Sequence, residues 1–139
     1  MAYKFLPHTA DTKIQAEGKS LEEAFSESAK ALKEAIAGKI KIKTKENKEI
    51  NVQGKDKESL LYSFIEEFLY LIDAEDFILS KIQELKIKEE NNQFSLTALA
   101  IGDKASSYKF NNGVKAITYN DMSIKEVKSK VTIIFVLDI

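Results

Sequence analysis

Two aspartates near opposite ends of the chain have the chemistry of cation ligands. Asp11 precedes the alternating stretch TKIQAEG, and Asp138 ends the apolar run FVLD directly before Ile139. A charged group at the end of an apolar strand needs water, a capping contact or a cation. An oxygen of Ile139 beside Asp138 would add to the negative charge there. Asp11 and Asp138 are therefore candidate metal ligands, while Asp11 has the alternative of capping the turn after Pro7.

His8 is the one histidine of the sequence and stands three residues before Asp11. With one histidine and no cysteine, the chain has no two-histidine metal site, thiolate nucleophile or cysteine-ligated zinc site. No serine lies in a G-x-S-x-G pattern, and neither a phosphate-binding loop nor H-E-x-x-H occurs. A bound metal would therefore use oxygen ligands and would be a hard cation such as calcium, magnesium or manganese.

The charges of the chain nearly cancel, with 21 basic residues, all of them lysine, against 22 acidic residues. Near neutrality disfavours a dedicated nucleic-acid binder. Without arginine the chain also lacks the planar donor that reads guanine and grips phosphate in a bidentate way. The alternating Lys39, Lys41, Lys43 and Lys45 have two interpretations: an RNA-facing stripe, or a solvated face that discourages edge pairing.

Hydrophobic periodicity predicts two helices. One begins after Ser20, which has Glu23 at capping-box spacing, and ends at Gly38; the other covers about residues 58–74. Strands are expected at 3–8 and 12–18, hairpins at 39–54 and 82–102, a surface loop at 103–113, and closing strands at 114–127 and 130–139, the last one central.

This order of elements predicts a single α+β domain over residues 1–139, with two helices packed on one large, mostly antiparallel sheet. The unit strand–helix–strand–strand occurs twice, without a repeat at the level of residues. No apolar run approaches the roughly 20 residues that a membrane-spanning helix needs. The N-terminal MAYKFLPHTAD also lacks the features of a signal peptide, so we expect a cytoplasmic protein.

Four stretches together resemble the archease family: HTADTKIQAEGKSLEEAF, the helix LLYSFIEEFLYLIDAEDF, GVKAITYNDM, and the terminal FVLDI. The resemblance implies two strand–helix–strand–strand modules, one inserted in the other. It also implies a protein cofactor, not a stand-alone enzyme. Archease assists the manganese- and GTP-dependent RNA ligase of tRNA splicing, promoting guanylylation of the ligase, multiple turnover and broader nucleotide use. The tRNA itself would be an indirect partner.

The resemblance also implies a metal site, because Asp11 and Asp138 match the family's ligands and Ile139 supplies a terminal or main-chain oxygen. Calcium is the expected ion, with magnesium or manganese as alternatives. Lys115 and Tyr119 keep the family pattern and are candidates to face the ligase or a nucleotide phosphate, or to be structural. The family commonly has histidine where this chain has Asn120, so no imidazole role transfers to that position.

Two other functions stay open at this stage. A metal-dependent phosphoesterase acting alone would need a general base, and His8 is the available candidate. The second alternative is an RNA-binding or chaperone module that uses the lysines at 39–45. Apart from these functions, His8 is either a local turn residue or a supporting partner of the Asp11 site. Intrinsic phosphatase activity would favour the first alternative, and salt-dependent RNA binding without the ligase would favour the second.

Overall fold

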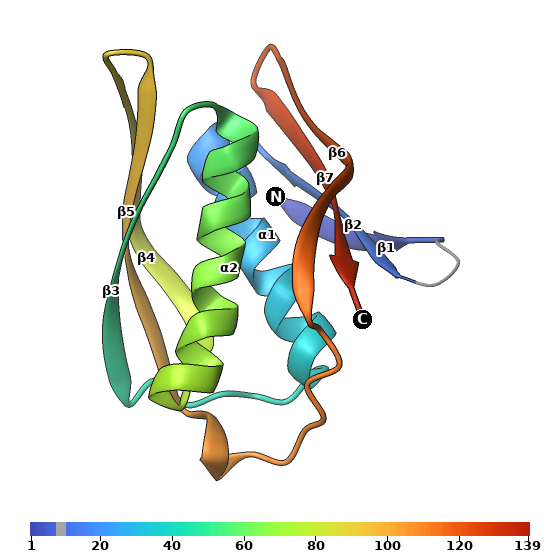
Figure 1. The fold of residues 1–139 in the computed structure, drawn as a ribbon, viewed down its shortest axis with the longest axis vertical. Helices are drawn as coiled ribbons and strands as arrows, with labels where there is room; N and C mark the ends of the chain where they lie inside the picture. Colours follow the sequence, from blue (N-terminus) through green and yellow to red (C-terminus); the bar gives the residue numbers. More distant parts are fainter. Residues whose placement is uncertain (8–10) are drawn as a thin grey trace.

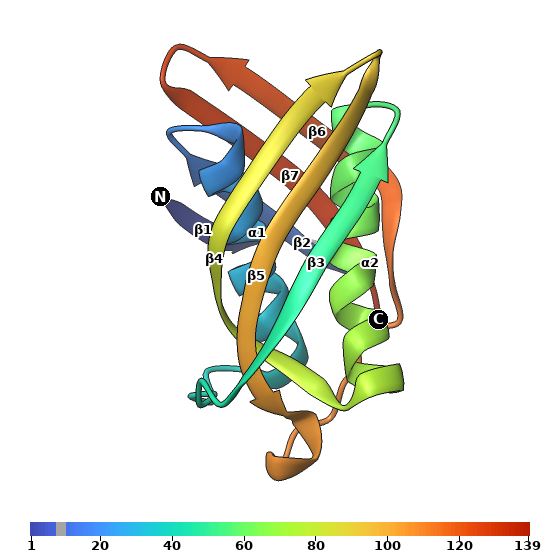
Figure 2. The same ribbon diagram turned by 90° about the vertical axis from the view of Figure 1, so that its left-hand side faces the viewer.

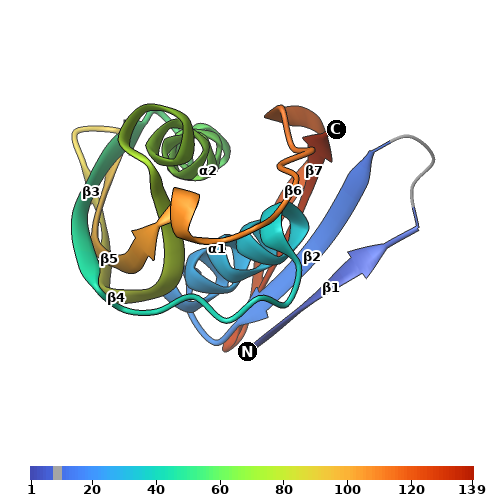
Figure 3. The same ribbon diagram turned by 90° about the horizontal axis from the view of Figure 1, so that it is seen from below.

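The computed structural model describes residues 1–7 and 11–139, in which two helices lie between two antiparallel sheets (Figures 1 and 3). The first sheet has the order β1-β2-β7-β6, and the second has the order β3-β5-β4. Figure 2 looks onto the second sheet, with the helices behind it. The elements are β1 (Ala2–Leu6), β2 (Thr12–Gly18), α1 (Leu21–Ala37), β3 (Glu46–Gly54), α2 (Lys57–Glu75), β4 (Phe77–Glu90), β5 (Gln93–Lys104), the short 3-10 helix η1 (Ala105–Ser107), β6 (Ala116–Val127) and β7 (Lys130–Asp138).

The α+β class with two helices and antiparallel strands is confirmed, and β7 is central as predicted. The strands differ from the prediction in forming two sheets instead of one. The physical reason lies in the helices: α1 packs against β2 and β4, and α2 packs against β3 and β6. Each helix therefore buries two sides, which explains the broad apolar stripe of α2. The rings of Phe25 and Phe64 join the two helices with their centroids 5.6 Å apart.

The two expected strand–helix–strand–strand modules are present, and one is inserted in the other. The first consists of β2, α1, β6 and β7, and the second, β3, α2, β4 and β5, lies between α1 and β6 in the sequence. In both modules the strand before the helix pairs with the last strand of the hairpin that follows. The modules thus share one topology.

A repeat at the level of residues does occur, contrary to our expectation, at the junction of strand and helix. Gly18 and Gly54 each end a strand two residues before the helix cap, in the segments Gly-Lys-Ser and Gly-Lys-Asp. The Ser20 side chain accepts a hydrogen bond from the Glu23 main-chain N–H at 3.1 Å. The equivalent cap, Asp56, accepts one from the Ser59 N–H at 2.7 Å. Both caps satisfy an N–H that the first helical turn leaves unpaired.

The predicted hairpin over residues 39–54 is wrong, because only β3 is a strand. Lys39 lies in a turn and residues 40–45 have no regular secondary structure, and β3 pairs with β5 instead. The side chain of Ile42 is buried, so this segment is anchored to the core although its lysines are exposed. The second predicted hairpin is confirmed, with Asn91 and Asn92 in the left-handed conformation at its tip.

Within the part of the chain that the structure describes, neither helix combines the length and the apolar character needed to cross a membrane. The buried side chains of both modules form one hydrophobic cluster that includes Ile14, Ile50 and Leu96. This cluster holds both sheets at fixed positions relative to the helices.

The close approach of Gly54 to α2 leads to a stability prediction. A Cβ at Gly54 would lie 2.5 Å from the Leu60 nitrogen and 2.7 Å from the Ser59 Oγ, and backbone cannot move aside cheaply. We expect Gly54→Ala to lower the free energy of unfolding by about 2 kcal/mol or more. Gly113→Ala, where a Cβ meets nothing within 4 Å, is the control and should change it by no more than about 0.5 kcal/mol. If Gly54→Ala and Gly113→Ala changed the free energy of urea unfolding equally, the close packing of Gly54 against α2 would be contradicted.

Asp103 leads to a prediction about pH. Its buried carboxylate accepts hydrogen bonds from the Tyr108 hydroxyl and the Lys104 N–H, which hold its pKa below the usual range. A lowered pKa stabilises the fold above the pKa of the unfolded chain, and the contribution is lost as the pH falls through the folded-state value. We expect Asp103→Asn to unfold at lower urea concentration than wild type at neutral pH, with the difference shrinking below about pH 4. A difference that does not change with pH would contradict this.

Candidate metal centre

Three strand ends meet at one end of the first sheet. Thr12, the first residue of β2, lies opposite Leu137 of β7, and Ala116, the first residue of β6, lies opposite Asp138. The Lys115 main-chain N–H donates a hydrogen bond to the Asp138 carbonyl oxygen at 2.8 Å. The last pair of the β2–β7 register is Thr12 with Leu137, so Asp11 directly precedes this pair on one chain segment and Asp138 directly follows it on the other.

Alternation along the strands gives Asp11 and Asp138 the same face of this sheet. Ile14 and Phe135, which lie opposite each other, are fully buried against the helices. Asp11 is an odd number of residues from Ile14, and Asp138 is an odd number from Phe135, so both belong to the outer face, turned away from the helices. Asp138 is exposed, and Asp11 is partly buried. Ile139 follows directly, with its side chain 48% exposed.

His8, which was predicted as a possible supporter of Asp11, lies outside the described residues. Among residues 1–7 and 11–139, no three His, Asp or Glu side chains form a group that could hold a metal ion. The oxygen donors brought together by the register are the carboxylates of Asp11 and Asp138 and the main chain of Ile139. Carboxylate and main-chain oxygens are ligands of hard cations, and calcium usually takes six to eight of them. The donor set therefore fits such a cation, with water or a partner completing its coordination.

A wide bulge interrupts β6 beside this site. Thr118 pairs with Val136, and the next pair is Ser123 with Ile134. Four residues of β6, 119–122, therefore lie opposite a single residue of β7. Asp121 in this bulge has a left-handed backbone, with φ of 57°. Bulges of this kind redirect side chains and are frequent near functional sites.

The bulge carries Asp121 to the outer face of the sheet. Its carboxylate lies 3.8 Å from the Nζ of Lys13, which stands two residues after Asp11 in β2. Sequence reasoning missed Lys13 and Asp121 as neighbours of the predicted ligands. The signal was the pair Asn120-Asp121, which are turn-type residues inside a strand pattern and therefore indicate a bulge. Lys13 thus supplies a positive charge close to Asp121.

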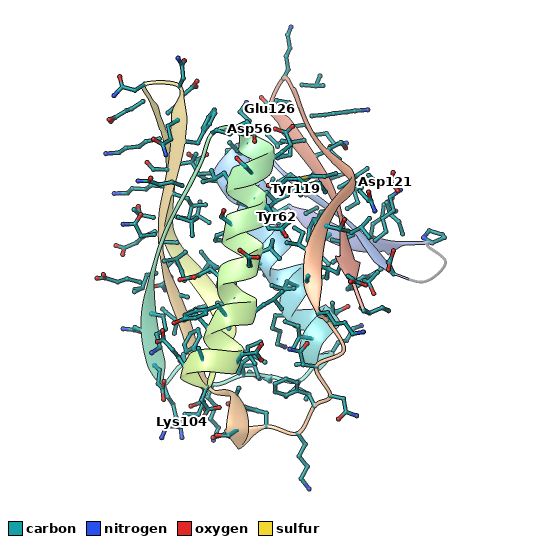
Figure 4. The ribbon with its side chains drawn as sticks, viewed as in Figure 1. Asp56, Tyr62, Lys104, Tyr119, Asp121 and Glu126 are labelled. Carbon is teal, nitrogen blue, oxygen red and sulfur yellow. The ribbon has the colours of Figure 1, made fainter. Side chains whose placement is uncertain are left out.

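Tyr119 lies on the other face of β6, apart from the two aspartates. Its ring stacks on that of Tyr62 of α2, with centroids 4.5 Å apart and planes 10° from parallel. Figure 4 shows the two rings between α2 and β6, whereas Asp121 lies on the far side of β6. Burial, followed by the nearby Tyr62, Asp56 and Glu66, raises the pKa of Tyr119. Tyr119 therefore stays protonated at neutral pH, and its ring remains 54% exposed.

Lys115, Ile117 and Tyr119 stand at alternate positions along the chain, which the sequence predicted to share one face. Ile117 of this set is buried. The contact that Lys115 makes with Asp138 is through its main chain. The predicted residues therefore divide into two groups. Asp11 and Asp138 follow the outer-face alternation at the end of the β2–β7 pairing, with Ile139 next in the chain, while Tyr119 lies on the opposite face and packs against α2.

Comparison with known proteins shows which family the chain is related to. The model of the Archease protein family (MTH1598/TM1083) matches residues 3–139. The chain is 39% identical to Protein archease of Pyrobaculum neutrophilum over 140 residues, which cover 99% of this chain and 95% of that protein.

Solved structures agree with the sequence match. The solution structure of protein 1598 of Methanobacterium thermoautotrophicum is similar with a TM-score of 0.83 at 29% identity, covering 99% of this chain and 98% of the other. A crystal structure from Thermotoga maritima, described as an archease and possible chaperone, has the same fold with a TM-score of 0.60 at 23% identity and covers 98% and 96% of the two chains. The chain belongs to the archease family.

Proposed function

We propose that this protein is an activating partner of the GTP-dependent tRNA-splicing RNA ligase. It promotes guanylylation of the ligase, allows multiple turnover and broadens nucleotide use, and it reaches tRNA through the ligase in the cytoplasm. The match to the family model over residues 3–139 supports this role. The description of the Thermotoga relative as a possible chaperone also fits a protein that acts on another protein and not as an enzyme alone.

The proposed activator uses a divalent cation, calcium by expectation and magnesium or manganese as alternatives, held by Asp11, Asp138 and an oxygen of Ile139. The β2–β7 register supports this part, because its last pair, Thr12 with Leu137, directly adjoins Asp11 and Asp138, although 126 residues lie between these two aspartates in the sequence. Two adjacent carboxylates repel each other unless a cation or a proton lies with them. Bound there, the cation supplies positive charge that offsets the phosphate charge of the guanylyl group.

The residues of this chain then have separate tasks. Asp11 and Asp138 bind the cation from the outer face of the sheet, and the Lys115 N–H fixes the main chain of Asp138. Tyr119, with its exposed ring supported by Tyr62, is proposed to contact the ligase on the opposite face. His8 is proposed to support Asp11 by a hydrogen bond. No observation favours an independent phosphoesterase over this role.

Cation binding is testable without the ligase. We expect calcium at about 100 times its dissociation constant to stabilise the wild-type protein by about 2.7 kcal/mol, because only the folded chain brings the two aspartates together. Asp11→Asn and Asp138→Asn should lose this stabilisation in thermal unfolding, with magnesium and manganese measured in parallel. Asp73→Asn, a change at an exposed aspartate on α2, is the control and should keep it. Equal stabilisation of all four proteins would contradict the site.

Ligase activation is tested by measuring guanylylated ligase and multiple-turnover RNA joining with the cognate ligase. We expect Asp11→Asn and Asp138→Asn each to reduce stimulation about tenfold or more, because the cation is lost from the complex. Asp73→Asn should stimulate as well as wild type. If the wild-type protein does not stimulate the ligase, the proposed function is wrong. If Asp11→Asn stimulates fully, the function stands without the cation.

A further inference from the structure

The exposed lysines of residues 39–45, where the predicted hairpin is absent, lie at one end of the molecule. Residues 38–45 and 104–109 meet at the end opposite the β4–β5 tip (Figures 1 and 2), where Figure 4 labels Lys104. None of the lysines in these two segments forms an ion pair with a residue within 1–7 or 11–139. The lysines of this lysine-rich end are Lys39, Lys41, Lys43, Lys45, Lys104 and Lys109, all of them exposed.

The acidic residues at the same end are engaged by local hydrogen bonds. The Asp76 carboxylate accepts bonds from the main-chain N–H and the hydroxyl of Ser106, both at 2.7 Å. Asp103 is buried and accepts its bonds from Tyr108 and Lys104. Glu75 pairs with Lys48 at 2.8 Å. These contacts engage three carboxylates locally, although the charges of Lys43 and Lys45 still reach Asp103 and that of Lys104 reaches Asp76. The six exposed lysines outnumber these carboxylates, so the near-zero charge of the whole chain does not describe this surface.

The lysine-bearing segment is held in place by its main chain. The Ser80 hydroxyl donates to the Ile42 carbonyl oxygen at 2.8 Å, and the Lys43 N–H donates to the Tyr108 hydroxyl at 2.9 Å. The Lys45 N–H donates to the Gly102 carbonyl oxygen at 2.8 Å. The segment is therefore ordered before any ligand arrives, which reduces the entropy lost on binding.

A shallow hollow of about 400 Å³ lies within this end, and we call it the lysine hollow. Its lining contains hydrogen-bond donors and no carboxylate: Lys33, Lys41, Ile42, Lys43, Thr44 and Ser80. Lys33 comes from α1, and its ammonium group donates to the Ile40 carbonyl oxygen. Burial lowers the pKa of Lys33, as expected for a cation partly removed from water. A set of donors and cations with no acidic residue matches the oxygens of a phosphate group.

We propose that the lysine hollow binds the phosphate backbone of an RNA strand directly. The contact is independent of base sequence, because lysine presents a point charge and the chain has no arginine to read base edges. A membrane surface fits less well, since every exposed large apolar side chain among the described residues lies outside these segments. Residues 109–115 run from this end to the start of β6 (Figure 1).

The choice of RNA among polyanions rests on the proposed function, but the test needs no ligase. We expect the protein alone to bind a fluorescent single-stranded RNA of roughly 12 nucleotides at low salt. With about four phosphate contacts, the logarithm of the affinity should fall with the logarithm of salt with a slope of about −3. Lys41→Gln with Lys43→Gln should weaken binding about tenfold or more and reduce the slope by about 1.4.

The matched control is the pair Lys86→Gln and Lys88→Gln in β4, which removes the same charge from exposed positions toward the opposite end. This control should bind RNA within about twofold of wild type, and Lys41→Arg with Lys43→Arg should retain binding because the charge is kept. Equal weakening by both glutamine pairs would overturn the proposal, as would RNA binding that salt does not affect. Binding to anionic lipid vesicles but not to RNA would also overturn it. Because no ligase is present, these outcomes are independent of ligase activation.

Discussion

The pairing of β2 with β7 is the constraint on which the rest of the molecule depends. It joins the beginning of the chain to its end, places β7 at the centre of the first sheet and closes the first module around the inserted second one. The last pair of this register, Thr12 with Leu137, directly adjoins Asp11 and Asp138. A contact between such distant residues carries a large loop-closure cost that the buried core must offset. The candidate metal centre therefore exists only in the complete fold.

The two modules explain how a small chain supports this arrangement. Each contributes one helix and three strands of the same order, and the helices fill the space between the sheets with shared side chains such as Phe25 and Phe64. The repeated glycine at each strand–helix junction lets the strand end approach the first helical turn closely. The first module carries the candidate metal centre, whereas the second supplies Tyr62 and, from β4, Ser80 in the lining of the lysine hollow.

Periodicity and caps were sufficient for the helices, for the central position of β7 and for the hairpin at Asn91 and Asn92. They failed at residues 39–45, where alternating lysines resemble a strand. There the Ile42 carbonyl oxygen is bonded by Ser80 and the Lys43 N–H by Tyr108, in place of a strand partner. They also could not distinguish two sheets from one large sheet. A helix packed between two sheets has nearly the same hydrophobic pattern as a helix that buries one broad face. Asp11 and Asp138 could be singled out by type and position. Lys13 and Asp121 could not, because only the bulge in β6 brings them together.

The bulge in β6 corresponds to irregular pairing in β4, the equivalent strand of the second module. Register shifts occur in the pairing of β4 with β5 and of β6 with β7, while the pairings of β1, β2 and β3 with their neighbours are regular. β4 and β6 occupy the same place in the two modules, and each is one of the two edge strands of its sheet. An irregular, charged edge strand is a poor template for another chain to extend. The segment that redirects Asp121 thus also makes this edge of the first sheet unfavourable for pairing with a neighbouring molecule.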